Sequence, residues 1–365
     1  MRRRTGVVAL AALAALLGGP LAACSSNASQ TSPTTPLATS TTLADTTTSS
    51  TSTTIPATAT TTAQMALERR VNILLLGGDA GPDRWKLRTD SMIVVSIDPV
   101  TGDTAMISVP RNLPRIEFPP GTPLAARFPD GFDAYEGLTN AVYTFVDIER
   151  SLTTGGEDAG AQAVKLGISQ FLGIPIQYYV LVDMAGFSDV VNVLGGIDVY
   201  VTKRVPAPDN PLDTGGTLPK YFEIGWGHFD GTFALSYARS RKADSDYWRM
   251  GRQRCVLAGL FTAAAPLSES GGLPALVSSF GTSVRTDIPA DQLDDIGQWV
   301  HLLIEHGGIT TVRTLHLAPP SVESSHWRSI AQHIRDVVTN TLVPGMLPGV
   351  EMPPGQTLVE QCNLA

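Results

Sequence analysis

The chain has 365 residues and a formal net charge of −8 at neutral pH, and only 16% of its residues are charged. This length allows one large domain or two ordinary ones. The acidic balance argues against a nucleic-acid partner, because non-specific binding to nucleic acid depends on net positive charge. A local group of arginines in such a chain indicates a site for a small anion.

The first part of the chain predicts an exported, membrane-attached protein. Residues 1–23 combine three arginines, an apolar run and small residues, which is the layout of a signal peptide. Leu21 to Cys24 resembles a lipobox, which implies cleavage before Cys24 and a lipid anchor on its thiol at the extracytoplasmic face of the membrane. Residues 24–64 are rich in Ser, Thr, Ala and Pro and predict a disordered stalk. No later apolar stretch is long enough to span a bilayer.

Removal of Cys24 into a lipid anchor leaves two cysteines, Cys255 and Cys362. An even number in an exported chain favours a disulfide that ties the C-terminal tail to a long helix. Two unpaired thiols are the alternative, because sequence spacing does not place the two residues side by side. Neither cysteine has partners at a spacing typical of a metal site.

Residues 65–343 predict one α/β domain, with a mixed central sheet and helices on both faces. Short apolar runs bounded by turn residues predict the first three strands, and the first two of these carry acidic residues at their ends. A loop rich in Pro and Gly follows at 118–137. In chain order, strands are expected at 71–76, 92–97, 104–109, 178–182, 197–201, 221–224 and 310–317. Helices are expected at 139–151, 158–171, 184–194, 273–280, 290–305 and 327–340, followed by an irregular tail at 344–365.

The most basic stretch is YARSRKADSDYWRMGRQR, residues 237–254. It predicts the end of a short helix capped by Asp230 and the start of a longer helix capped by Ser245 or Asp246. The apolar face of the longer helix is expected to include Trp248, Val256, Leu260 and Phe261. Arg249, Arg252 and Gln253 share one face of its first turns. A solvated charged surface is the alternative, but several arginine forks in one short span favour a phosphate site.

Two carboxylates complete the candidate site. Asp79 and Asp90 flank a turn between strands and suit a divalent cation such as Mg²⁺ or Mn²⁺. Arginines near the strand ends and in the basic stretch are placed to neutralise a diphosphate: Arg88, Arg111, Arg115, Arg239 and Arg241. A cation and arginines around a phosphoester are the recurring arrangement for phosphoryl transfer.

The chain resembles the LytR-CpsA-Psr (LCP) family of cell-wall glycopolymer ligases over roughly residues 71–260. The similar segments occur in the family's order: NILLLGGD, LRTDSMIVVSID, ISVPRN, LGIPIQYYVLVDMAGFSDVVNVLGGIDVYV, FDGTFALSYARSR and DSDYWRMGRQ. The resemblance implies transfer of a glycopolymer from a polyprenyl diphosphate carrier to peptidoglycan through a phosphodiester. Hydrolysis of the diphosphate by water is the expected side reaction.

The resemblance also assigns residue roles. It implies that Asp79 and Asp90 bind the metal, and that one of them accepts a proton. The diphosphate is assigned to Arg88, Arg111, Arg115, Arg239, Arg241 and Gln253, with lesser roles for Asp246, Arg249 and Arg252. Asp79, Asp90, Arg88 and Arg111 form the catalytic set. The family also implies an apolar tunnel for the polyprenyl chain. Residues 184–194 and 256–261 are candidates for its lining, and ordinary core packing is the alternative for them.

Two departures from the family pattern motivate a different function. Asn112 stands where an aspartate is usual, and Leu138 stands where many members have lysine. The alternative is a non-catalytic, lipid-anchored protein that binds polyprenyl-linked glycans or acts as a scaffold. Turnover separates the two hypotheses, because a binding protein takes up the lipid-linked diphosphate and forms no product.

Overall fold

The computed structural model describes most of the chain after residue 56. The described residues are 57–79, 87–133, 135–153, 158–208, 218–242, 244–269, 283–289, 292–317, 327–350, 352–353 and 357–364. The predicted signal peptide, Cys24, most of the predicted stalk and the helix expected at 273–280 lie outside these residues. Within them, no helix combines the length and the hydropathy needed to cross a membrane.

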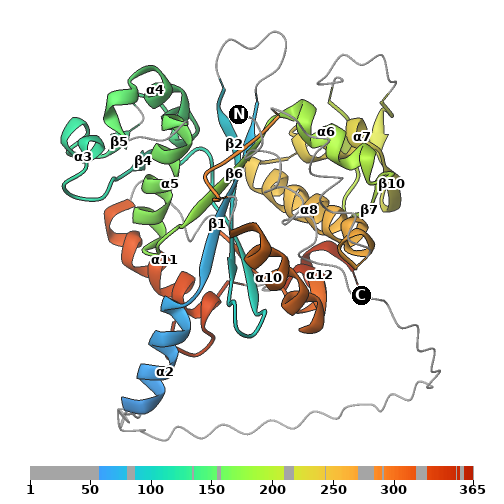
Figure 1. The fold of residues 1–365 in the computed structure, drawn as a ribbon. Coiled ribbons are helices and arrows are strands. Elements are labelled where there is room, and N and C mark those ends of the chain that lie inside the picture. Colours follow the sequence, from blue (N-terminus) through green and yellow to red (C-terminus); the bar gives the residue numbers. More distant parts are fainter. Residues whose placement is uncertain are drawn as a thin grey trace, which may run out of the picture.

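A six-stranded sheet forms the centre of the domain (Figure 1). Its strand order is β11-β6-β1-β2-β3-β12. The pairs β1/β6 and β3/β12 are parallel and the other neighbours are antiparallel, so the sheet is mixed, as the sequence predicts. The strands are β1 (Val71–Gly78), β2 (Thr89–Ile97), β3 (Thr104–Ser108), β6 (Tyr178–Val182), β11 (Val284–Thr286) and β12 (Arg313–His316).

Helices cover both faces of this sheet, because its central strands are apolar on both sides. In β2, Met92 and Val94 point into one core while Ile93 and Val95 point into the other. The first core is closed by α4 (Val142–Ile148), α5 (Ala159–Leu172) and α11 (Trp327–Leu342). The second is closed by α6 (Met184–Val193), α7 (Gly231–Arg239), α8 (Asp246–Glu269) and α10 (Leu293–Glu305). The α/β class with helices on both faces is therefore confirmed.

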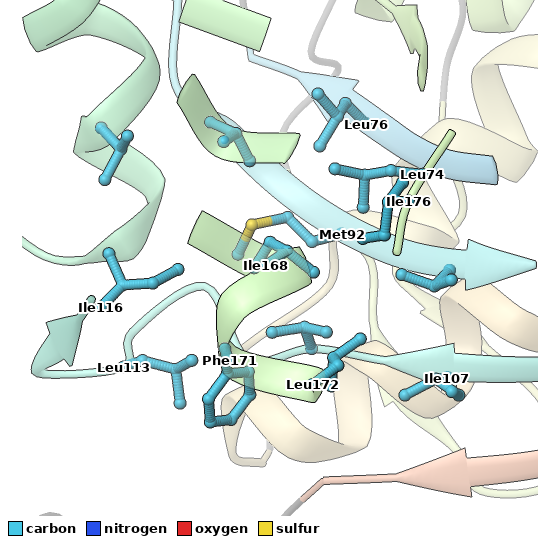
Figure 2. Packing of buried hydrophobic residues seen from close by; sticks show 14 of the residues in the cluster. Leu74, Leu76, Met92, Ile107, Leu113, Ile116, Ile168, Phe171, Leu172 and Ile176 are labelled. Atoms are coloured by element: carbon cyan, nitrogen blue, oxygen red, sulfur yellow. The ribbon is translucent and has the colours of Figure 1, made fainter. Parts of the chain in front are cut away.

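Figure 2 shows the first core, in which β1 and β2 meet α5. Leu74, Met92, Ile168 and Leu172 all belong to this core, and all four are almost fully buried. The helix α5 begins where Asp158 accepts a hydrogen bond from the N–H of Ala161, at 2.9 Å. Such an N-cap satisfies one of the free N–H groups at the start of a helix.

Short elements connect and extend this framework. The strands β7 and β10 form an antiparallel pair outside the central sheet. The strands β4 and β5, and likewise β8 and β9, form antiparallel pairs in which each strand has two residues. The remaining elements are β4 (Arg115–Ile116), β5 (Phe132–Asp133), β7 (Ile197–Val201), β8 (Val205–Pro206), β9 (Tyr221–Phe222), β10 (Gly225–Phe229), α2 (Ala57–Glu68), α3 (Pro123–Arg127), α12 (Leu358–Cys362), η2 (Thr139–Ala141), η3 (Arg150–Leu152) and η5 (Gly308–Thr311).

The structure corrects four expectations. Residues 57–64 of the predicted stalk belong to α2, which Leu67 packs against the first core. The loop at 118–137 contains α3, and the tail contains α12, which starts with a capping box at Thr357. Trp248 is 57% exposed and is not part of the apolar face of α8. For α3 and α12, the burial of Leu124 and Leu358 in the core, which local composition does not report, decides the outcome.

A disulfide joins Cys255 of α8 to Cys362 of α12, with a Cα–Cα distance of 5.3 Å. Both residues belong to the second core. The cysteine count left open either a disulfide or two unpaired thiols, and the structure contains the disulfide. This bond fixes the C-terminal helix against α8, where Leu358 is fully buried.

Replacement of both cysteines, Cys255→Ser with Cys362→Ser, should lower the free energy of unfolding by roughly 2–4 kcal/mol. The bond spans 107 residues, so its loss frees a long loop in the unfolded chain. Urea unfolding at neutral pH measures the change, and reduction of the wild-type protein should give the same shift. An unfolding midpoint that neither treatment moves would contradict a stabilising role for the bond.

Candidate active site

A cavity of about 360 Å³ lies between the second face of the sheet and the helices α6, α7 and α8. One part of its lining is apolar, with Leu75, Ile93 and Val180 from the sheet. The helices add further apolar side chains from residues that the sequence analysis named as candidates for a tunnel: Met184, Phe187, Val190, Val256, Leu257 and Leu260. The other part of the lining is charged and gathers most of the residues predicted for the site.

The antiparallel pairing of β1 and β2 brings the two carboxylates to one end of the sheet. Gly78 of β1 pairs with Thr89 of β2. Asp79 comes directly after Gly78 and Asp90 directly after Thr89, so the two aspartates lie at one end of these neighbouring strands. The N–H of Arg88 donates to Asp79 Oδ1 at 2.7 Å, and the N–H of Asp79 donates to the carbonyl of Arg88 at 3.0 Å. Asp79 is only 6% exposed and lines the cavity.

The close approach of β1 and β2 explains why a glycine stands at position 77, just before the first carboxylate. A Cβ on Gly77 would lie 2.9 Å from the Cβ of Ser91 on β2. That distance is shorter than non-bonded carbon contacts allow, so a larger residue would push the strands apart. The pair of strands therefore keeps its spacing at the point where both carboxylates enter the cavity.

A chain of ion pairs links Asp90 to the start of α8. Arg111 donates from Nη1 to Asp90 Oδ2 at 2.6 Å and from Nε to Asp246 Oδ1 at 3.2 Å. Asp246 also accepts from Arg249 Nε at 3.0 Å and from Arg249 Nη2 at 2.9 Å. Arg241 Nε lies 3.5 Å from Asp246 Oδ1. One carboxylate thus holds three arginines that line the cavity.

Hydrogen bonds also fix the charge of Asp90. Burial on its own would raise the pKa of Asp90, but hydrogen bonds from Arg111 and Asn140 outweigh it and hold the pKa below its ordinary value. Asn140 donates to Asp90 Oδ1 at 2.8 Å. Burial would also raise the pKa of Asp246, but the neighbouring Arg249 and Arg111 lower it below its ordinary value. Both carboxylates are ionised at neutral pH.

The structure brings together eight of the residues predicted for the site and separates three others. The cavity is lined by Asp79, Arg88, Asp90, Arg111, Arg239, Arg241, Arg249 and Gln253. Arg115 lies outside the lining and pairs with Asp133 at 3.3 Å. Arg252 also lies outside it, pairs with Asp244 at 2.8 Å and donates to the carbonyl of Ser240. Asp246 is not a lining residue and acts through the arginines.

Asn140 is a site residue to which the sequence analysis gave no role. It lies in η2, and its backbone N–H donates to the carbonyl of Arg111 at 3.0 Å. Both bonds join Asn140 to residues far away in sequence, so no local pattern indicates them. Gln253 also contacts the β1–β2 region, because its Oε1 accepts from Ser91 Oγ at 3.2 Å.

The two carboxylates can supply part of the ligand set of a divalent cation. Among the described residues, no group of three or more His, Cys, Asp or Glu side chains is arranged to hold a metal ion. Asp79 and Asp90 nevertheless line one cavity, and carboxylate oxygens retain a second lone pair beside a hydrogen bond. Mg²⁺ commonly takes one or two carboxylates together with phosphate oxygens of a ligand. The donor set therefore fits a cation that is completed by a bound diphosphate.

Comparison with known proteins identifies the family. The sequence model of the LytR_cpsA_psr family matches residues 37–315, which is most of the chain. The chain belongs to the LytR_cpsA_psr family. All of the charged residues that line the cavity fall within the matched region.

Named relatives of this LytR_cpsA_psr protein are teichoic acid transferases. It is 28% identical over 238 residues to the polyisoprenyl-teichoic acid–peptidoglycan teichoic acid transferase TagU of Bacillus mycoides, covering 64% of this chain and 66% of TagU. It is 32% identical over 220 residues to the transferase TagV of Bacillus subtilis, covering 60% of this chain and 49% of TagV. The matched region is thus less than two thirds of either relative.

A solved structure agrees with the fold. The crystal structure of B. subtilis TagV aligns with a TM-score of 0.50 and 25% sequence identity, over 74% of this chain and 97% of that chain. The mixed sheet with helices on both faces is therefore the fold of a LytR_cpsA_psr protein.

The substitution Asp246→Asn should lower the free energy of unfolding by roughly 3 kcal/mol, because it leaves the guanidinium of Arg249 buried without its carboxylate. The side chains of Arg249 and Asp246 are 3% and 11% exposed. Affinity for inorganic diphosphate should fall as well, since the arginines lose their alignment. Urea unfolding and titration calorimetry measure the two effects. The control Asp133→Asn weakens the partly exposed pair with Arg115 and should cost less than about 1 kcal/mol.

The same variant should reveal a pH dependence. The pKa of Asp246 is lower in the folded protein than in the unfolded chain, so its contribution to stability is complete above the unfolded value of about 4. The contribution is lost as the pH falls through the folded-state pKa. The stability difference between the wild type and Asp246→Asn should therefore shrink on acidification below about pH 4. A difference that stays constant would show that the charge of Asp246 is not its source.

Proposed function

We propose that the protein transfers a glycopolymer from a polyprenyl diphosphate carrier to a hydroxyl of peptidoglycan, leaving a phosphodiester. The observation that carries this proposal is the composition of one cavity, in which an arginine group adjoins an apolar lining. A polyprenyl diphosphate has the same two parts, a charged head and an apolar chain. The names of the TagU and TagV relatives support the same class of donor and acceptor.

The arginines supply most of the charge that a diphosphate needs. Arg88 comes from the β1–β2 connection, and Arg239 and Arg241 come from α7 and the residues after it, so segments far apart in sequence supply the charge. A guanidinium fork binds two phosphate oxygens at once. Charge that develops on the leaving phosphate is stabilised by groups already in place, which lowers the barrier without rearrangement.

The reaction is a substitution at phosphorus. The oxygen of a peptidoglycan hydroxyl forms a bond to the phosphorus that carries the glycan, the bond from that phosphorus to the bridging oxygen breaks, and polyprenyl phosphate leaves. The hydroxyl proton needs an acceptor. One of the two carboxylates, Asp79 or Asp90, would accept it; the pKa of Asp90 is lowered by its hydrogen bonds from Arg111 and Asn140, which weakens Asp90 as a base. Water in place of the hydroxyl gives hydrolysis of the diphosphate.

A divalent cation is part of the same proposal. Mg²⁺ or Mn²⁺ would be held by Asp79 and Asp90, and when bound it supplies further neutralisation of the diphosphate oxygens. Arg111 then has a second task, because its bond to Asp90 fixes the orientation of that carboxylate. Arg111 is itself held by Asp246, so a carboxylate outside the cavity orients one inside it.

The proposal places the domain at the extracytoplasmic face of the membrane. The lipobox-like sequence at residues 21–24 supports a lipid anchor on Cys24. An enzyme that uses a lipid-borne donor needs to stay close to the membrane. A lipid anchor would keep the domain there.

The alternative of a non-catalytic binding protein is less well supported. It rests on Asn112 and Leu138, and both side chains are exposed in the structure, with Leu138 at 41%. Neither residue is among those that line the cavity. The departures from the family pattern therefore do not remove a charged group from it.

The test compares Arg239→Ala with Arg115→Ala. With a polyprenyl diphosphate-linked glycan, peptidoglycan fragments and Mg²⁺, Arg239→Ala should reduce kcat/KM by roughly 100-fold, because it removes a group that contacts the diphosphate. Arg115→Ala should cost less than about tenfold, since Arg115 lies outside the cavity and beside Asp133. Mass spectrometry of the glycan-linked fragments measures transfer. Tight uptake of the donor by the wild-type protein with no product would favour the binding protein instead.

A second prediction concerns the apolar lining. Ala238→Phe fills space in the cavity and should raise KM for donors with a long polyprenyl chain, while the affinity for inorganic diphosphate stays within twofold. Ala238→Ser changes the volume little and serves as the control. Equal losses for short-chain and long-chain donors would show that the apolar lining does not hold the lipid.

A further inference from the structure

A second cavity, of about 340 Å³, lies against another face of α8. It shares no lining residue with the first cavity. Its walls come from α8, from Lys203 after β7, from His316 of β12 and from Gln361 of α12. Its size is in the range of small-molecule sites, and among its described lining residues none is acidic.

Arg254 gives this cavity a buried positive charge. Its side chain donates from Nε to Gln361 Oε1 at 2.7 Å and from Nη1 to Ser108 Oγ at 2.8 Å, and the residue is only 2% exposed. Both acceptors are neutral, and within the described part of the chain Arg254 makes no ion pair. Burial lowers the pKa of Arg254 to about 9, so it stays protonated at neutral pH. A buried charge without a carboxylate is costly, and an anionic ligand would offset that cost.

His316 adds a polar group that has no hydrogen-bond partner among the described residues. Its Nε2 is buried and makes no hydrogen bond with any described residue. Burial and the neighbouring Arg254 lower the pKa of His316 to about 3, so the imidazole is neutral. A neutral imidazole nitrogen can donate to or accept from a hydroxyl group, depending on the tautomer. A bound hydroxyl would therefore satisfy it.

Two aromatic rings supply flat apolar surfaces. Trp248 is 57% exposed, and the Lys203 Nζ lies 5.3 Å from the centre of its ring. The ring centre of Tyr247 lies 6.3 Å from that of His316. Exposure of the large apolar surface of an indole to water is unfavourable, and a ligand that covers the indole would remove that unfavourable hydration. The apolar face of a sugar ring has a matching shape.

We propose that this second cavity binds a sugar that carries a carboxylate or phosphate group. The acidic group is recognised by Arg254 with help from Lys203, a hydroxyl by His316, and the ring by Trp248. The site uses no residue of the first cavity and does not depend on the transfer reaction. Its ligand class is that of acidic glycans, whether the acidic group is a carboxylate or a phosphate.

The test uses three sugars that differ only at C6: glucuronate, glucose 6-phosphate and glucose. Ligand-detected NMR on the full chain should give dissociation constants for one or both acidic sugars at least tenfold lower than for glucose. Which of the two binds more tightly identifies the acidic group. Trp248→Ala and Lys203→Ala, both at exposed positions, should weaken binding at least fivefold without affecting folding. Arg254→Gln should abolish it, with thermal unfolding as the check on its fold.

Arg239→Ala is the control for the first cavity and should leave the three constants unchanged. Equal affinity for all three sugars would overturn the proposal, as would loss of acidic-sugar binding in Arg239→Ala. Acetate and inorganic phosphate that bind as tightly as the sugars would overturn it too, because the ring would then contribute nothing. Loss of transfer in Arg239→Ala with binding retained would separate this site from the proposed reaction.

Discussion

The buried ion pair between Asp246 and Arg249 is the constraint on which the charged part of the first cavity depends. A guanidinium that is almost fully buried needs a carboxylate, and Asp246 meets that need with two hydrogen bonds. The same side chain reaches Arg111 and Arg241, and Arg249 also donates from Nη1 to the carbonyl of Asp90 at 2.8 Å. The pair thus fixes the start of α8 against β2, and the arginines take their positions from it.

The helix α8 acts as a wall between two different environments. Gln253, Val256 and Leu257 line the first cavity, whereas Arg254 and Cys255 line the second. Neighbouring residues on a helix point in directions about 100° apart, so one short segment can serve both sides. The disulfide at Cys255 holds α12 against the second side, where Gln361 contacts Arg254. Anchoring of the tail therefore shapes the second cavity and leaves the first untouched.

The sequence predicted most of the framework because its signals there are local. The strands at 178–182 and 197–201 are apolar runs bounded by turn residues, and Asp230 caps α7 by a bond to the N–H of Phe233 at 2.8 Å. It did not predict which arginines meet. Arg115 belongs to a two-residue strand whose partner contains Asp133, and neither periodicity nor a family motif reports that pairing. The sequence did not predict the role of Asn140 for the same reason, because the residues that Asn140 contacts are distant in sequence.

The charge balance of the first cavity explains why so many arginines are needed. Its described lining holds the arginines at 88, 111, 239, 241 and 249 against Asp79, Asp90 and Asp183, which leaves an excess of positive charge. Without a ligand, part of that charge is offset within the protein, because Arg111 pairs with Asp90 and Asp246 pairs with three of the arginines. A diphosphate diester carries one negative charge on each phosphate. The two negative charges of such a ligand would oppose the positive charge that the carboxylates leave, so the cavity favours an anion of this kind.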